Sequence, residues 1–333
     1  MMSSTASKPI ASNPAVGAAV ALALVLSACA SLQSAERPGG RSWRPVDGLV
    51  AWSRVDSLSG GGVEVYAGQG VARPLRAWAL RIDERRADVE TRVAVAADTG
   101  NVRETTSTFA REAGACVAVN GGYFRMGAFP ATAVGWLVRD GRTLAPPTSA
   151  ETRDGVRYPT ARAALGLTAD GRAEIAWAVL RPDSTVGRAD GPPVGRDGVP
   201  AGALPEASPW TVRDAIGAGP MLLRGGGLRV TAAEEVFFGT SIPATHPRTA
   251  VGVAPDGALI VVVVDGRQAQ SAGVDLNDLA RLMAAAHARD ALNLDGGGSS
   301  AVVVRGVRLN RPTGGGVERE VHNALVTTCG ARW

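Results

Sequence analysis

Short apolar runs, each bounded by glycine, proline or aspartate, recur along most of the chain after residue 47. Such runs are typical of β-strands, because side chains alternate between the two faces of a sheet and turn residues end each strand. The pattern predicts strands at residues 63–66, 75–82, 116–119, 134–138, 163–167 and 175–178. Asp140-Gly141 and Asp170-Gly171 separate neighbouring runs and predict hairpin turns.

The last third of the chain has the clearest pattern. Residues 249–253 and 258–264 flank Pro255-Asp256-Gly257, which predicts a hairpin. The second run is apolar at every position, which is typical of a strand buried on both faces. A helix is predicted over residues 276–288, because its leucines share one face and Asp275 suits its N-cap. We also expect a short helix at 105–113 and strands at 291–294, 301–304, 307–309 and 324–328.

The N-terminal segment has the pattern of a targeting sequence. Lys8 lies in a short polar region, and the apolar residues 15–26 are too few to span a bilayer core of about 30 Å. Leu26-Ser27-Ala28-Cys29 resembles a bacterial lipobox, which predicts a lipoprotein signal peptide at residues 1–28 and lipidation of Cys29. The alternative is an ordinary signal peptide with an incidental cysteine. Because Ala30 follows Cys29, we expect an outer-membrane lipoprotein of the bacterial cell envelope that faces the periplasm.

The domain organisation follows from composition. Residues 29–46 have the composition of a tether, and residues 47–331 are predicted to form one domain. Residues 182–209 are rich in proline, glycine and aspartate without periodicity, so we expect an inserted surface loop there. Apolar residues make up 45% of the 333 residues, which is enough for a core.

Charge and cysteine content narrow the classes of function. The net charge of +4 is spread along the chain without a basic block, so binding to nucleic acid is not expected. Apart from Cys29, the chain has Cys116 and Cys329, each in an apolar run. In an oxidising compartment they could form a disulfide, or they could be buried free thiols. They do not resemble a metal site.

Asp-Gly occurs nine times, so the pair alone predicts only a turn. Asp265 and Asp295 differ from the others because each follows a buried apolar strand, and Asn120-Gly121-Gly122 follows a third such strand. Polar side chains and glycines at strand ends suit a ligand crevice, because glycine lets a ligand approach the backbone and exposed N–H groups bind anionic oxygens. The alternative is three structural caps at tight corners.

Three arginines flank these strand ends, namely Arg248, Arg267 and Arg319. A guanidinium fork suits phosphate or carboxylate. The run from Gly296 to Ser300 contains neither a G-x-S-x-G elbow nor a P-loop, which disfavours a serine hydrolase and a nucleotide-binding loop. The histidines lack the spacing of metal ligands, and His287 is expected on the predicted helix.

Six segments with a recognisable character occur in order along the chain. They are AVNGGYF (118–124), GAGPMLLRGG (217–226), RTAVGV (248–253), VVVVDGR (261–267), NLDGGGSSAVVVRG (293–306) and EREVHNAL (318–325). With these segments the chain resembles the phosphodiester glycosidase family from about residue 90 to residue 328. The resemblance implies an α+β fold, a single domain of curved mixed β-sheets with flanking helices. It also implies hydrolysis of a sugar-1-phosphodiester at the C1–O bond, in a cell-surface or periplasmic glycan.

The resemblance and the strand-end pattern together assign roles. Asp295 is expected to be the nucleophile or base, and Asp265 its carboxylate partner or a ligand of a sugar hydroxyl. Arg248 and Arg267 are expected to clamp the phosphate. The predicted substrate-binding residues are Asn120, Gly121, Gly122, Arg248, Arg267, Gly296, Gly297, Ser299, Arg319 and Asn323.

Other possibilities stay open at this point. No cofactor is expected, although Asp265, Asp295 and Asn120 are oxygen ligands of the kind that a divalent cation such as Ca²⁺ or Mg²⁺ prefers. The expected partners are a phosphorylated glycan and, through the Cys29 lipid, a membrane. The alternative functions are a non-catalytic lipoprotein that binds anionic glycan and a phosphodiesterase that cuts the P–O bond.

Overall fold

The computed structural model describes residues 49–97, 102–192 and 199–330. The predicted signal peptide, Cys29 and the whole predicted tether lie outside these residues. The elements below belong to the unit that spans Trp43–Trp333. Within the described ranges, no helix is both long and apolar enough to cross a membrane.

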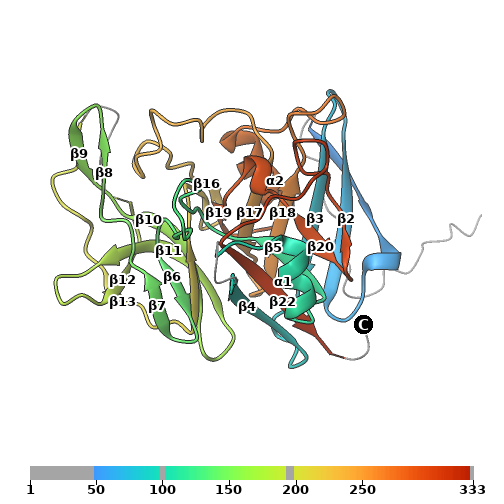
Figure 1. Cartoon of the computed structure of the whole chain (residues 1–333), viewed down its shortest axis with the longest axis horizontal. Helices are drawn as coiled ribbons and strands as arrows, with labels where there is room; N and C mark the ends of the chain where they lie inside the picture. Colours follow the sequence, from blue (N-terminus) through green and yellow to red (C-terminus); the bar gives the residue numbers. More distant parts are fainter. Residues whose placement is uncertain (1–48, 98–101, 193–198, 331–333) are drawn as a thin grey trace, which may run out of the picture. The chain divides into compact units, whose positions relative to one another are not determined.

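The largest sheet of the described domain has eight strands (Figure 1). Its strands, in spatial order, are β1 (Val50–Arg54), β2 (Val63–Gly70), β3 (Arg76–Ile82), β18 (Leu259–Val264), β17 (Arg248–Val253), β19 (Asp290–Asn293), β15 (Met221–Arg224) and β16 (Gly227–Leu228). The helix α2 (Leu276–Ala285) packs on one face, where it meets Ile260, Val262 and Val264 of β18. The alternate side chains of β18 enter the main core on the other face. This double burial explains why β18 is apolar at every position, as predicted.

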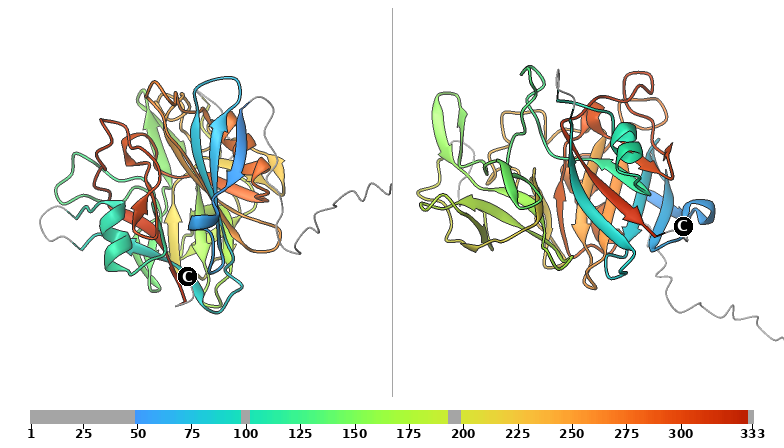
Figure 2. Two further views of the ribbon diagram at one scale, coloured as in Figure 1. Left: turned by 90° about the vertical axis from the view of Figure 1, so that its right-hand side faces the viewer. Right: turned by 60° about the horizontal axis from the view of Figure 1, so that its bottom comes forward.

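A five-stranded sheet lies against the main core. Its order is β21 (Val307–Arg308), β20 (Val302–Val304), β5 (Val117–Asn120), β22 (Asn323–Cys329) and β4 (Val89–Val95). The short helix α1 (Thr106–Glu112) covers its outer face through Phe109 and Ala110 and lies beside β22 in both figures (Figure 2). The Thr105 hydroxyl accepts a hydrogen bond from the main-chain N–H of Thr108, so Thr105 caps this helix.

The third large sheet has seven strands. They are β13 (Ser208–Pro209), β12 (Val186–Ala189), β11 (Ala173–Leu180), β10 (Arg162–Leu167), β14 (Asp214–Gly217), β6 (Leu137–Arg139) and β7 (Arg142–Ala145). A separate hairpin consists of β8 (Ala150–Arg153) and β9 (Val156–Pro159), and two single 3₁₀ turns are η1 (Asp56–Leu58) and η2 (Gly297–Ser299). All three large sheets contribute side chains to one core, for example Val261, Leu325 and Leu165. Shared burial of this kind holds the sheets together.

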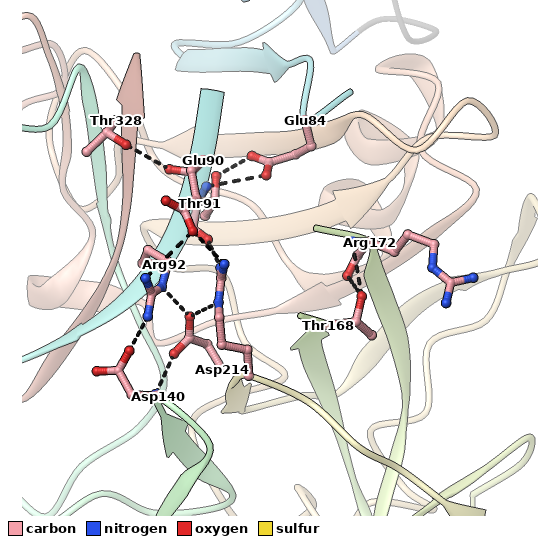
Figure 3. Close-up of polar contacts among 10 residues, drawn as sticks. Glu84, Glu90, Thr91, Arg92, Asp140, Thr168, Arg172, Asp214 and Thr328 are labelled. Atoms are coloured by element: carbon pink, nitrogen blue, oxygen red, sulfur yellow. Dashed lines mark hydrogen bonds and ion pairs between the residues drawn. The ribbon is translucent and has the colours of Figure 1, made fainter. Parts of the chain in front are cut away.

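A buried carboxylate also joins two of the sheets (Figure 3). Asp214 of β14 is fully buried and accepts hydrogen bonds from Arg92 Nε of β4 at 2.8 Å and from Arg213 Nε at 3.0 Å. Its other oxygen accepts from the main-chain N–H of Asp140 at 2.9 Å. Arg213 continues the network through Nη1 to Glu90 at 2.5 Å. The charge of Asp214 is therefore compensated on both sides.

The predicted β-sheet fold is confirmed, but helices are few and the pairings between the described strands are antiparallel instead of mixed. The prediction of an inserted loop at 182–209 is wrong for part of that segment, because β12 and β13 lie in it and extend the edge of the seven-stranded sheet. The inward residues of β12 are Gly187 and Ala189, which are too small to give an apolar pattern. Residues 193–198 of that segment lie outside the described residues.

Three further predictions have clear outcomes. The helix predicted over 276–288 ends at Ala285, and His287 lies beyond it with a left-handed φ of 61°. The strand predicted from 134 begins only at Leu137, since Gly135 takes a φ of 100°. Cys116 and Cys329 form a disulfide with Cα atoms 5.8 Å apart, so of the two alternatives the disulfide is confirmed.

Candidate active site

The loops that follow β5 and β19 meet at one place. The main-chain N–H of Asp295 donates to the carbonyl of Gly121 at 3.1 Å. Asn120 Nδ2 donates to the carbonyl of Asp295 at 2.8 Å. Two of the strand-end motifs that stood out in the sequence are therefore in direct contact, although 175 residues separate Asn120 from Asp295.

The predicted ligands Asn120 and Asn323 are engaged inside the protein. Asn120 is fully buried, and its Oδ1 accepts from Thr249 Oγ1 at 2.7 Å and from the N–H of Ala301 at 3.1 Å. Asn323 is also buried, and its Oδ1 accepts from the N–H of Gly122 at 2.8 Å. These side chains hold the loops of the site in place instead of presenting polar atoms to a substrate.

The two glycines after Asn120 are required by close packing. A Cβ on Gly121 would stand 2.1 Å from Asn323 Oδ1, and a Cβ on Gly122 would stand 2.5 Å from the carbonyl oxygen of Gly217. Real Cβ atoms do not approach so closely, so glycine is needed to bring two sheets together here. The expectation that these glycines make room for a substrate is replaced by this packing role.

Asp295 carries the perturbed carboxyl group of the site. Burial raises its pKa to about 6, against the opposing effects of the Ser299 hydroxyl, the N–H of Gly296 and the Arg319 guanidinium. Gly296 donates to Oδ1 at 2.9 Å, while the residue as a whole keeps some exposure to solvent. A carboxylate that is ionised at neutral pH yet costly to ionise is suited to act as a nucleophile or base.

The three consecutive glycines leave room for two arginine side chains and for the main chain of Pro247. A Cβ on Gly298 would stand 2.3 Å from Arg319 Nη2, and one on Gly297 would stand 3.5 Å from Arg267 Nη1. At Gly296 a Cβ would stand 2.8 Å from the carbonyl oxygen of Pro247. The glycine loop next to Asp295 is therefore the surface on which two guanidinium groups lie.

Arg267 and Arg319 are exposed, and neither has a carboxylate within ion-pair distance among the residues that the structure describes. Arg248 differs from them because it is buried. Its Nε donates to the carbonyl of Val274 at 3.1 Å, and its Nη2 donates to that of Ile242 at 2.6 Å and to that of Ala244.

Burial lowers the pKa of Arg248 to about 10. Three main-chain carbonyls bind its Nε and Nη2, so Arg248 anchors the loop before β17. Its role as a phosphate clamp stays a prediction.

Asp265 lies behind the glycine loop. Its Oδ1 accepts from the N–H of Arg311 at 2.9 Å and from Asn310 Nδ2 at 3.3 Å, and Asn310 Nδ2 also donates to the carbonyl of Ser300 at 2.9 Å. Burial raises the pKa of Asp265, which is only 4% exposed. The structure thus connects Asp265 to the loop of Asp295 through Asn310, with its carboxylate used for support.

Sequence reasoning did not find Tyr123 and Asn293. The hydroxyl of Tyr123 donates to the carbonyl of Gly219 at 2.8 Å and accepts from Asn293 Nδ2 at 2.8 Å. Burial and, next, the charge of Asp295 raise the pKa of Tyr123. Their positions in the segments AVNGGYF and NLDGGGSS could have indicated them, because each is a polar residue beside a strand end.

Two buried polar atoms near Asp295 make no hydrogen bond with any described residue. They are Asn293 Oδ1 and Ser300 Oγ. Buried polar atoms are normally satisfied, so this loop has unused capacity for a polar ligand. The sequence had indicated neither of these two atoms.

No group of three or more His, Cys, Asp and Glu side chains in the described ranges is placed to hold a metal ion. Asn120 Oδ1 and Asp265 Oδ1, two of the oxygens considered above as cation ligands, each accept two hydrogen bonds from the protein. A groove of about 440 Å³ lies elsewhere, between β4, α1 and β22, and its lining contains none of the predicted site residues.

The fold is shared with proteins of known structure. A hypothetical protein from Synechocystis superimposes with a TM-score of 0.57 at 18% identity over 84% of this chain and 64% of that chain. The catalytic domain of zebrafish N-acetylglucosamine-1-phosphodiester alpha-N-acetylglucosaminidase, auto-inhibited by its pro-peptide, superimposes with a TM-score of 0.54 at 21% identity over 86% of this chain and 84% of that chain. Identities this low show a common fold and no more.

Sequence comparison defines the family. A profile of the phosphodiester glycosidase family matches residues 113–328, and the chain belongs to this family of glycosidase-type hydrolases. The SPbeta prophage-derived uncharacterized protein YomE of Bacillus subtilis (strain 168) is 40% identical over 80 residues, which are 24% of this chain and 12% of that protein. The chain thus spans a small part of that relative and under two thirds of the Synechocystis protein.

Proposed function

We propose that the protein hydrolyses a sugar-1-phosphodiester by cleaving the C1–O bond, with the Asp295 carboxylate at the anomeric carbon. One observation carries the proposal. A carboxyl group with a raised pKa belongs to a glycine loop against which two exposed arginines lie, and neither arginine has a carboxylate partner in the described part of the chain. This arrangement offers a reactive carboxylate and an anion site within one loop.

The chemistry of the leaving group fits such a site. C1–O cleavage expels a phosphomonoester, whose second pKa of about 6 makes it a good leaving group. Strong general-acid help is therefore less necessary than for an ordinary glycoside. This agrees with an Asp265 carboxylate that is occupied by Asn310 and the main chain of Arg311.

The residues divide the work between charge and position. Asp295 either attacks C1 or removes a proton from the water that attacks it. Arg267 and Arg319 would neutralise the charge that develops on the departing phosphate. Asn120 and Asn323 would keep Asp295 and the Gly121-Gly122 turn in register.

A panel of sugar-1-phosphodiesters in oxygen-18 water tests the proposal with the chain expressed from residue 30. Label in the released sugar supports C1–O cleavage, whereas label in phosphate identifies a P–O phosphodiesterase. Saturable binding without turnover identifies a glycan-binding protein. Asp295→Asn should lose most of kcat and remain folded.

We also propose, from the sequence alone, that the protein is anchored in the bacterial cell envelope through lipidated Cys29. A phosphorylated glycan of the cell surface would then lie within its reach. Metabolic labelling with a palmitate analogue should label the full-length chain but not a Cys29→Ser variant. Equal labelling of both chains would contradict the anchor.

A further inference from the structure

His246 has no role in the site as described so far. It precedes Pro247 and β17, and its main chain is fixed by a reciprocal pair of hydrogen bonds with Val274, N–H to carbonyl in each direction at 3.1 Å. Close packing supports this pairing, because a Cβ on Gly273 would stand 2.4 Å from the carbonyl oxygen of His246. The backbone that carries the imidazole is therefore held firmly.

The imidazole lies between two partners. Its Nε2 is 2.8 Å from the carbonyl oxygen of Ser241, and its Nδ1 is 3.1 Å from Arg267 Nη2. A carbonyl can only accept, so Nε2 carries the hydrogen, and a guanidinium can only donate, so Nδ1 offers its lone pair. The two contacts together select one neutral tautomer of His246.

The surroundings of His246 favour this neutral form. Burial lowers its pKa, and the positive charges of Arg267 and Arg248 lower it further, against the opposing effect of hydrogen bonds to the main chain of Ser241 and Thr245. Both charged neighbours are cations, and no carboxylate contacts the ring among the described residues. A charged imidazolium would lose the contact with Arg267 and face like charge.

Arg267 is a residue that needs support. It is exposed and has a left-handed φ of 57°, and its guanidinium lies over Gly297. The side chain of Arg267 forms a hydrogen bond with His246. A long exposed arginine loses rotamer freedom when it is fixed by a ligand, unless a partner already holds it in place.

We propose that neutral His246 is a positioning residue that holds the Arg267 guanidinium over the Gly297 loop, ready to receive the phosphate group of the substrate. The inference rests on the proposed function only in naming the substrate. The held guanidinium itself follows from the contacts of His246. Arg267 is the group that would touch phosphate, and His246 acts through it.

Two substitutions separate this role from simple packing of the ring. His246→Asn keeps an acceptor near the position of Nδ1, whereas His246→Phe keeps the ring and removes the acceptor. For binding of inorganic phosphate, measured by calorimetry, the Phe variant should be weaker by about tenfold, the value of one charge-assisted hydrogen bond, and the Asn variant by less. If ring packing were all that mattered, Phe would bind at least as well as Asn, and the proposal would fail.

A double-mutant comparison sharpens the test. In an Arg267→Gln background, His246→Phe should change phosphate affinity by less than about twofold, because no guanidinium is left to hold. A full tenfold loss in that background would overturn the positioning role. For a diester that the protein hydrolyses, KM should be about tenfold higher in the Phe variant, and kcat should change less. The reason is that Arg267 contacts the phosphate in both the ground state and the transition state.

The outcome does not depend on turnover. If no sugar phosphodiester is hydrolysed but phosphate binding still follows the order wild type, Asn, Phe, the proposed function fails and the role of His246 stands. Long-range proton–nitrogen NMR of the imidazole should show an unprotonated Nδ1 near neutral pH. A protonated Nδ1, or wild-type protein that does not bind phosphate, would overturn the inference.

Discussion

Replacing Asp295 by asparagine should separate catalysis from stability. The substitution keeps the size of the side chain and an oxygen that accepts the hydrogen bond from Gly296. It removes the carboxylate, which burial makes costly to ionise. The prediction is a protein that is nearly inactive and yet more stable than the wild type at neutral and alkaline pH.

The magnitude follows from the pKa. The carboxyl group of Asp295 has a pKa of about 6 in the folded protein, against an ordinary value of 3.8. Each unit corresponds to about 1.4 kcal/mol, so ionised Asp295 costs the folded state at most about 3 kcal/mol. Since the residue is partly exposed and solvent screens its charge, a gain of about 1–3 kcal/mol is expected in the free energy of unfolding.

The sign with pH is fixed by linkage. The folded state holds the Asp295 proton more tightly than the unfolded chain, so this residue makes wild-type stability fall as pH rises from about 4 to about 6. The asparagine variant lacks this contribution. Its advantage should therefore be near zero below about pH 4 and complete above about pH 7.

Urea unfolding at about pH 4, 6 and 8 measures the difference, and turnover is measured on the same samples. Asp214→Asn is the matched control, because Asp214 is a buried carboxylate with two arginine partners and its replacement should destabilise. A less stable Asp295→Asn protein at about pH 8, or a gain that is unchanged at about pH 4, would refute the burial argument. A folded variant with wild-type turnover would refute the catalytic assignment.

Three further predictions concern other parts of the molecule. Asp214→Ala should lower the free energy of unfolding by about 1–3 kcal/mol, because it removes the buried acceptor that Arg92, Arg213 and the N–H of Asp140 share, and denaturant titration checks this. Gly298→Ala should raise KM by about tenfold at nearly unchanged melting temperature, because the new Cβ displaces the Arg319 guanidinium by its 2.3 Å approach to Nη2. A double Cys116→Ser, Cys329→Ser variant should lose about 2–5 kcal/mol of stability, and an equal loss on adding reductant to the wild type would confirm the source.

Much of the fold could be predicted from patterns within single elements. β18 is apolar throughout because two cores cover it, and the N-cap hydrogen bond of Asp275 to the N–H of Asp278 follows from local chemistry. β12 was not predicted, because its inward residues are glycine and alanine, which carry almost no hydrophobic signal. Main-chain pairing with β11 holds this strand in the sheet instead, and a hydrophobic pattern does not reveal such pairing.

The location of the candidate site could be predicted from the sequence, but the role of each residue in the site could not. Asp295, Arg267 and Arg319 converge as their places beside strand ends suggested. Arg248 and Asn120 were expected to face a ligand and are buried instead, because segments far away in the sequence supply their partners. Sequence spacing cannot show which carbonyl or hydroxyl a distant loop will bring to a given side chain.

The disulfide has a consequence for how the chain withstands cleavage. It joins residues 213 positions apart, so all the site residues from Asn120 to Asn323 lie within one covalent ring. A single protease cut in any surface loop of that ring would open it without releasing a fragment. Because β5 and β22 also stay paired beside the disulfide, the protein could continue to work as two chains joined by one bond.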